Sequence, residues 1–139
     1  MWITWKQANK KLHNEKVYWV STASKNGDPH AVPVWGVWIN ESFYFETNPK
    51  SSKGRNLAAN PKIVFHLQDG METVIVKGSA KREKDQRKLQ MLRAEYLRKY
   101  DYKPDWSNDQ NQIVFRVTPR IAHAWKAPRM HRSLVNFVF

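Results

Sequence analysis

The sequence predicts a mainly β protein, a closed or nearly closed antiparallel barrel of about six strands with flanking helices. Segments rich in β-branched and aromatic residues recur at short spacing, separated by turn-forming residues such as Asn26-Gly27. Only one longer helical segment interrupts them, so the helices that a doubly wound parallel sheet needs between strands are missing. At 139 residues we expect one domain, spanning residues 1–139.

The N-terminal half is expected to begin with a short helix capped by Thr4. The apolar face of this helix is formed by Trp5, Ala8 and Leu12. Asn26-Gly27 is a strong hairpin signal, because both residues tolerate positive φ angles. The sequence therefore predicts a three-stranded antiparallel meander at residues 17–24, 30–39 and 43–47.

The C-terminal half contains a second hairpin and the longer helix. A short helix is expected to start at Ser51 or Ser52 and to stop at Asn60-Pro61, because proline disfavours helical backbone in the residue before it. The hairpin turns at Asp69-Gly70, and the longer helix, residues 84–100, should lie on the barrel surface with a basic outer face. Its narrow apolar stripe is formed by Leu89, Leu92, Tyr96 and Tyr100. The remaining strands are expected at residues 62–68, 72–83, 112–119 and 120–127.

Composition excludes several classes of function. The chain has no cysteine, and its five histidines never pair at metal-ligand spacing, so neither disulfides nor a metal site is expected. It has no apolar run of the ~20 residues that a membrane span needs and no signal-peptide pattern, which predicts a soluble, cytoplasmic protein. The net charge of +12 favours anionic partners. No nucleophile or acid–base motif is present, so any reaction would depend on a cofactor and no catalytic residue is assigned.

One candidate site is the strand that Pro33 and Gly36 interrupt. Proline cannot donate a ladder hydrogen bond and glycine allows close backbone approach, so this strand is expected at an edge or a bulge. Val34, Trp35 and Trp38 stand beside these breaks. An apolar strand with spare backbone amides suits the edge of a planar heterocycle, whereas the alternative is a barrel corner with two packed tryptophans.

A second candidate site is the basic loop, residues 47–55. A phosphate monoester needs cations and directional donors, and the start of a helix adds free amides. The alternatives are a contact to nucleic acid and a solvated basic turn. The loop's candidate cations are Lys50, Lys53 and Arg55, and its candidate hydroxyls are Thr47, Ser51 and Ser52.

The order of motifs resembles the pyridoxamine 5'-phosphate oxidase-like, FMN-binding split-barrel family. The resemblance runs from about Tyr18 to Trp125, and its most specific parts are PHAVPVW at residues 29–35 and SSKGRNLAANP at residues 51–61. It implies a homodimer of six-stranded split barrels with two flavin sites at the subunit interface. Arg129-Met130-His131 is similar to the Arg-x-His that contacts substrate phosphate in pyridoxamine phosphate oxidases, so Arg129 and His131 are candidate ligands of an anionic substrate.

The resemblance also implies roles for the two candidate sites. The residues that would line the isoalloxazine are Val32, Pro33, Val34 and Trp35. Those that would hold the ribityl phosphate are Thr47, Ser51, Ser52 and Lys53, with Lys50 or Arg55 assisting. Trp125 would approach the flavin from the opposite subunit, and Asn56 would order the loop rather than touch the ligand.

The leading hypothesis is an FMN-binding oxidoreductase-like protein that transfers hydride or electrons between the flavin and a small substrate. A deazaflavin-dependent reductase is the first alternative, because its cofactor phosphate would occupy the same site. A non-catalytic module that binds flavin, haem or another tetrapyrrole is the second. Nucleic-acid binding, suggested by the net charge of +12 and the interleaved aromatics, is the least favoured because no RNP1-like motif is present.

Overall fold

Eight strands and three helices make up residues 3–127 and 133–139, which are the residues that the computed structural model describes. The helices are α1 (Trp5–Asn14), α2 (Ser52–Ala59) and α3 (Gln86–Tyr100). The strands are β1 (Tyr18–Ala23), β2 (Pro29–Val34), β3 (Val37–Ile39), β4 (Ser42–Thr47), β5 (Lys62–Leu67), β6 (Glu72–Arg82), β7 (Ile113–Lys126) and β8 (Val135–Val138). The mainly β class with flanking helices is confirmed.

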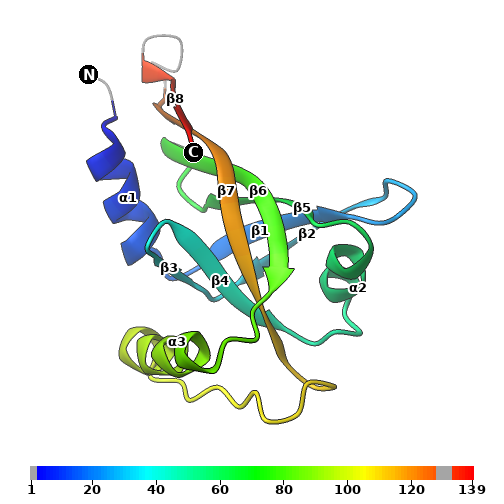
Figure 1. Ribbon diagram of the computed structural model, residues 1–139. Helices are drawn as coiled ribbons and strands as arrows, with labels where there is room; N and C mark the ends of the chain where they lie inside the picture. The colour runs from blue at the N-terminus through cyan, green and yellow to red at the C-terminus, as the bar shows by residue number, and fades with distance from the viewer. Residues whose placement is uncertain (1–2, 128–132) are drawn as a thin grey trace.

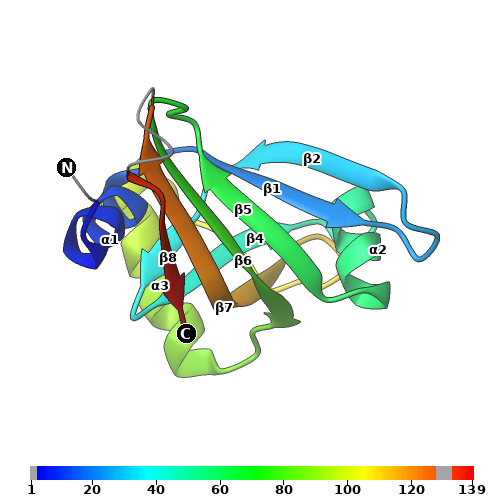
Figure 2. The same cartoon turned by 90° about the horizontal axis from the view of Figure 1, so that it is seen from above.

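The strands form one curled antiparallel sheet in the order β2-β1-β5-β6-β7-β4-β3, with β8 paired to β7 (Figures 1 and 2). The two outermost strands of this order, β2 and β3, are consecutive in the chain and joined by Trp35 and Gly36 alone. We call these two residues the crossover. Because such a short link joins opposite ends of the sheet, the sheet has to curl round on itself as a half-barrel.

The expectation of six strands is wrong, and the described residues contain eight. The expected strand at residues 30–39 is broken at the crossover into β2 and β3. The first half, β2, pairs with β1, and the second half, β3, pairs with β4, so no single strand lies between β1 and β4 as in a meander. The two strands expected between residues 112 and 127 are instead one long strand, β7. The short strand β8 was not expected.

Close packing explains the break at the crossover. A Cβ atom added to Gly36 would lie against the Phe43 ring and 2.8 Å from the Tyr44 carbonyl oxygen. Only glycine lets the chain pass so close to β4. The turn after β1 uses Gly27 at a φ of 87°, whereas Asn26 has no positive φ.

The barrel core is filled from the alternate residues of each strand that face inward. In β1, Tyr18, Val20 and Thr22 are buried while the residues between them are partly exposed. Aromatic rings fill the centre: the Phe43 ring lies 4.6 Å from that of Tyr18 and 4.4 Å from that of Phe65. The β-branched and aromatic residues from which the strands were predicted therefore supply the side chains of this core.

The helices are positioned by caps and by their apolar faces. Thr4 caps α1, as expected, within a full capping box, which was not predicted, and Ala8 and Leu12 are buried. The helix α3 packs Leu89, Leu92 and Tyr96 against a second cluster below β3 and β4. In Figures 1 and 2, α2 lies on the opposite side of the barrel from α1. No helix within the described residues is both long and apolar enough to cross a membrane.

Candidate functional site

A cavity of about 390 Å³ lies where the end of β4, the start of α2, the crossover and the segment after α3 meet. Figure 1 shows that segment, in yellow, running beneath the sheet toward the loop before α2. Five of the predicted cofactor-binding residues line the cavity: Val34, Trp35, Thr47, Ser51 and Lys53. Four other residues line it as well: Glu46, Asn48, Tyr102 and Gln112. The two candidate sites of the sequence are therefore walls of one cavity.

The start of α2 is built around the Ser51 hydroxyl. As the N-cap, its Oγ accepts a hydrogen bond from the Gly54 amide at 3.1 Å and donates one to the Asn48 carbonyl at 2.7 Å. Thr47 Oγ1 lies 2.8 Å from Ser51 Oγ, so the two hydroxyls are hydrogen-bonded to each other. They hold the loop in shape and leave the amides of Ser52 and Lys53, at the start of α2, without a partner among the described residues.

Lys53 adds a cation to these free amides. Its side chain is half-buried at the cavity, and burial lowers its pKa below the usual lysine value. Within the part of the chain that the structure describes, Lys53 has neither an ion pair nor a hydrogen bond. A partly desolvated cation without a counter-charge is unfavourable, and an anion bound in the cavity would compensate it.

Gly54 and Asn56 fix α2 in place. A Cβ atom on Gly54 would lie 2.6 Å from the Asn48 carbonyl oxygen and 2.9 Å from that of Pro49, so only glycine lets the basic loop pack against the first turn. Asn56 donates a hydrogen bond from Nδ2 to Thr22 Oγ1 at 3.0 Å and so ties α2 to β1. The structure thus places Asn56 where it orders the helix.

The aromatic wall of the cavity is Trp35 of the crossover. Trp35 is 50% exposed. Its indole ring stacks on the Tyr100 ring, with the ring centroids 4.7 Å apart and the ring planes at 3° to each other. Tyr96 donates its hydroxyl to the Trp35 carbonyl at 3.4 Å. The ring is therefore held flat by α3 while a large part of it stays accessible to a planar ligand.

A buried lysine, Lys99, holds the other half of the crossover. Its Nζ donates to the Gly36 carbonyl at 2.9 Å and to the Tyr18 hydroxyl at 2.7 Å, and burial lowers its pKa to about 8. Tyr100 accepts the Gly36 amide at 3.0 Å. The sequence analysis missed Lys99, although it follows Tyr96 by three residues and so lies on the buried face of the helix.

The remaining wall of the cavity carries hydrogen-bond acceptors. The Glu46 carboxylate accepts the Tyr102 hydroxyl at 2.6 Å and the Trp106 indole N–H at 2.6 Å. Two causes raise the pKa of Tyr102 to about 12: burial, which is the larger, and the hydrogen bond to Glu46. The Tyr102 hydroxyl therefore stays protonated at neutral pH and donates its hydrogen bond. Gln112 Oε1 is buried and has no hydrogen-bond partner within the described residues. In the sequence, only Tyr102 and Trp106, two aromatic residues in the otherwise polar segment after α3, indicated that this segment packs against the barrel.

Several predicted residues lie outside the cavity. Val32 packs against the barrel core, and Pro33 is exposed opposite Trp19 of β1. Trp125 lies near the far end of β7, opposite Thr73 of β6. Within one chain these residues do not meet the cavity.

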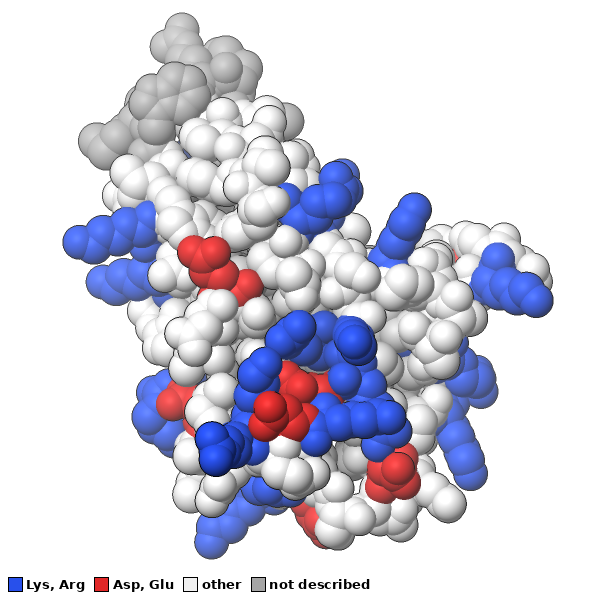
Figure 3. All heavy atoms as spheres, in the orientation of Figure 1, with Lys and Arg blue, Asp and Glu red and all other residues white. Residues whose placement is uncertain are grey.

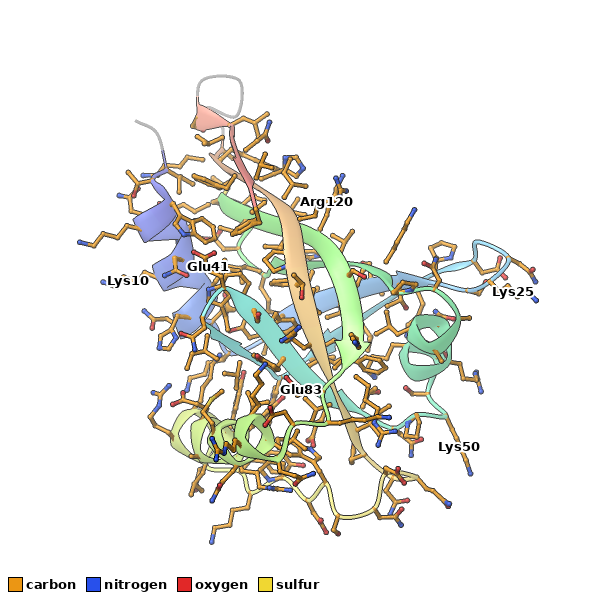
Figure 4. All side chains as sticks on the ribbon, in the orientation of Figure 1. Lys10, Lys25, Glu41, Lys50, Glu83 and Arg120 are labelled. Carbon is orange, nitrogen blue, oxygen red and sulfur yellow. The ribbon has the colours of Figure 1, made fainter. Side chains whose placement is uncertain are left out.

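The other residues predicted in the basic loop point into solvent. Lys50, Ser52 and Arg55 are exposed, and Figure 4 shows the Lys50 side chain directed away from the barrel. Arg129 and His131 lie outside the described residues. Within the described residues no three histidine, aspartate or glutamate side chains gather as a metal site.

A second cavity of about 440 Å³ lies between α1 and the β5–β6 turn, and two of its three lysines are paired with an acidic side chain. Lys11 and Lys126 both pair with Glu72, at 2.5 Å and 3.9 Å. Asp69 accepts the amides of Met71 and Glu72. Lys10 also lines this cavity, but it is exposed, so water solvates its charge, whereas Lys53 at the α2 cavity is half-buried.

Comparison with known proteins agrees with the fold. The sequence profile of the pyridoxamine 5'-phosphate oxidase family matches residues 4–126. No curated protein sequence matches significantly. Among solved structures, a heme-binding protein from Mycobacterium smegmatis aligns over 94% of this chain with a TM-score of 0.78 and 19% identity. This chain spans 56% of that protein's length.

Two further solved structures of similar fold are named for a flavin or the related cofactor F420. A FAD-binding protein from Mesorhizobium loti aligns over 86% of this chain and 92% of its own, with a TM-score of 0.68 and 19% identity. An F420 reductase aligns over 81% of this chain and 94% of its own, with a TM-score of 0.64 and 21% identity. At these identities the likeness establishes the fold alone.

Proposed function

The chain belongs to the pyridoxamine 5'-phosphate oxidase family, and from that premise we propose that it binds FMN in the cavity beside α2 and uses it to exchange hydride or electrons with a small substrate. The observation that carries the proposal is the meeting of Lys53, the free amides at the start of α2 and the exposed face of Trp35 in one cavity. A phosphate site and a planar aromatic surface are the two features that FMN requires.

The residues present fit this cofactor. Lys53 and the amides of Ser52 and Lys53 would hold the phosphate, and Val34 and Trp35 would pack on the ring. Thr47 and Ser51 contribute by shaping the loop, since their hydroxyl protons are already engaged with each other and with Asn48. Bound FMN would supply the redox chemistry, which the side chains alone do not offer.

The test is the visible spectrum of the purified protein, followed by titration with FMN. We expect a yellow protein, or a colourless one that binds added FMN with quenching of flavin fluorescence. A protein that is colourless and also fails to bind added FMN would contradict the proposal. Reduction of the bound flavin by a nicotinamide donor would then separate an oxidoreductase from a protein that only carries the cofactor.

A deazaflavin is the first alternative cofactor, since one solved structure of similar fold is an F420 reductase. Its phosphate would take the same position beside Lys53. Extraction of the bound cofactor and measurement of its mass separate the two.

Heme binding without turnover is the second candidate function. It is favoured by the heme-binding protein of similar fold, and tetrapyrroles also need a flat apolar surface. Titration with hemin gives a Soret band if heme binds, and competition with FMN tells whether both use the cavity. Nucleic-acid binding is the least favoured function. It would need a continuous basic surface. On the face of the molecule drawn in Figure 3, acidic side chains lie among the lysine and arginine side chains.

A homodimer would complete the site. The outer face of β1, β5, β6 and β7 carries a third cavity of about 940 Å³, which a second copy of the chain could cover. Trp125 would then reach the flavin of the opposite subunit. Light scattering gives the mass in solution, and a monomer that still binds FMN would contradict this part of the proposal.

A further inference from the structure

The cavity of about 940 Å³ on the outer face of β1, β5, β6 and β7 is lined by a group of cations that the proposed function does not use. We call it the outer cavity. Its cations are Lys62 of β5, Lys77 of β6 and Arg120 of β7, and none of its lining residues is acidic. Within the described residues, none of these three side chains has an ion pair or a hydrogen bond.

Strand pairing holds two of these cations side by side. In the β5–β6 ladder Val64 lies opposite Lys77, and Lys62 lies opposite Ser79. Lys62 and Lys77 are therefore diagonal neighbours on the outer face of the sheet, and the backbone sets their Cα atoms about 7–8 Å apart.

A β-bulge brings Arg120 next to Lys77. Ile121 pairs with Lys77 and Pro119 pairs with Gly78, so Arg120 is the extra residue of β7 between these two pairs. A bulge re-aims the side chain of its extra residue, and Figure 4 shows Arg120 projecting from the ribbon of β7. A Cβ atom on Gly78 would lie 2.2 Å from a backbone oxygen of β7, so this close approach needs glycine. The position of Arg120 is thus fixed by the packing of two strands.

Hydroxyl groups and apolar side chains complete the outer cavity. Ser79 lies between Lys62 on one neighbouring strand and Thr118 on the other, and both hydroxyls line the cavity. Hydroxyls can donate to the oxygens of an anion. Val64 and Phe139 supply apolar surface in the same cavity.

The grouping of the cations, rather than their burial, distinguishes the outer cavity. All three are exposed, so water solvates each of them. However, the strands hold them together with no carboxylate among the lining residues, whereas acidic side chains lie among the lysines of the cavity at α1. Like charges held side by side repel one another, and a bound anion would offset this repulsion.

From this arrangement we infer that the outer cavity binds an organic diphosphate, with its linked phosphates at Lys62, Lys77 and Arg120 and its organic group against Val64 and Phe139. A single phosphate carries about 1.5 to 2 negative charges, so two linked phosphates offset three cations better than one does. The volume of about 940 Å³ is that of a small-molecule site and leaves room for the organic group.

The outer cavity is separate from the cavity proposed for FMN, since the two share no lining residue. The inference therefore does not depend on the proposed function. It is also compatible with a homodimer, because a second copy over this face would add three more cations, and the bound diphosphates would offset the repulsion between the copies.

The experiment is calorimetric titration of the full chain with ADP, pyrophosphate, orthophosphate and adenosine. The variants are Lys77→Gln and Arg120→Gln, each of which removes one charge from an exposed position. The matched control is Lys25→Gln, which removes the same charge from the exposed β1–β2 hairpin, away from the outer cavity (Figure 4). A second control is Lys53→Met, which changes the cavity proposed for FMN.

We expect one ADP per chain, bound more tightly than pyrophosphate, with pyrophosphate bound about tenfold more tightly than orthophosphate and adenosine not bound. Arg120→Gln should weaken ADP and pyrophosphate about tenfold and Lys77→Gln about fivefold, because each loses a charged hydrogen bond at an exposed site. Both controls should bind ADP as the wild type does. In the wild-type protein, the Nε–H resonance of Arg120 should shift on addition of ADP and stay in place with adenosine, a measurement that needs no variant.

The inference is overturned if ADP does not bind, or if Lys77→Gln and Arg120→Gln bind it as tightly as the wild type. It is also overturned if Lys25→Gln weakens ADP as much as they do, since net charge alone would then explain the binding. Orthophosphate as tight as pyrophosphate rejects the two linked phosphates, and ADP weaker than pyrophosphate rejects the organic group.

Two outcomes separate this inference from the flavin proposal. If FMN displaces ADP and Lys53→Met abolishes ADP binding, ADP occupies the cavity at α2 and the inference is overturned. If FMN does not bind while ADP binds with dependence on Arg120, the flavin proposal fails and the inference stands.

Discussion

Lys53 lines the cavity beside Trp35, and Lys99 is hydrogen-bonded to Gly36, but the two lysines differ in what compensates their charge. Burial lowers the pKa of both side chains. Lys99 donates hydrogen bonds to Gly36 and Tyr18, and its Nζ lies over the Tyr18 ring at 4.7 Å. Lys53 has no such partner within the described residues.

The difference separates a structural lysine from a binding one. The free-energy cost of removing a cation from water has to be offset, by the fold or by a ligand. At Lys99 the fold supplies the partners, so this residue holds the crossover. At Lys53 the partner is left to a bound anion, so this residue marks the site.

The largest expected effect comes from Gly54→Ala, which tests whether the loop around Lys53 depends on close packing. The added Cβ would meet backbone oxygens of Asn48 and Pro49, which cannot move without shifting the loop. We expect a loss of about 3 kcal/mol in the free energy of unfolding. Urea unfolding measures it, with Gly70→Ala as the control, because nothing lies within 4 Å of a Cβ at Gly70.

Lys53→Met tests the binding half of the comparison. Loss of a charged hydrogen bond to phosphate should weaken FMN about 30-fold, or about 2 kcal/mol. Stability should be unchanged or higher, because the variant removes a partly buried charge without a partner. Fluorescence titration measures the affinity, with Lys50→Met as the exposed control. An unchanged affinity in Lys53→Met would refute the assignment of the phosphate to Lys53.

Lys99→Met tests the structural half through pH. The folded-state pKa of Lys99 is about 8, below the ordinary 10.5, so between these values the unfolded chain binds more protons. The stability of the wild type relative to that of Lys99→Met should therefore rise from pH 8 to 10 by about 1–2 kcal/mol, while the tyrosines with raised pKa values lower the stability of both proteins alike. Urea unfolding at pH 7, 8, 9 and 10 measures it, and an identical pH profile in both proteins would show that Lys99 does not titrate in this window.

Tyr100→Phe has the smallest expected effect and separates the two functions of that ring. The variant keeps the stack on Trp35 but leaves the Gly36 amide without its acceptor. We expect a loss of about 1 kcal/mol in stability and little change in FMN affinity. Thermal unfolding and the FMN titration check both. A large fall in affinity with intact stability would place Tyr100 in the binding site itself.

The sequence by itself determined the local features of the protein. The Thr4 cap, a cap at Ser51 or Ser52, the turn at Asn26-Gly27 and the strand segments were all predicted, because each depends on residues within a few positions of one another. The five predicted residues that line the cavity came from two short segments, the strand at Pro33 and Gly36 and the basic loop at residues 47–55. The family resemblance rested on those motifs, and the family is confirmed.

Only the tertiary structure decided how these pieces meet. The strand break at Gly36 follows from the approach of Phe43, and one wall of the cavity joins Glu46, Tyr102 and Gln112 from three separate segments. Lys99 finds its partners in a turn and a strand more than sixty positions earlier in the chain. Such contacts depend on packing between segments that the chain brings together only when the sheet curls, and no local pattern of residues encodes that distance.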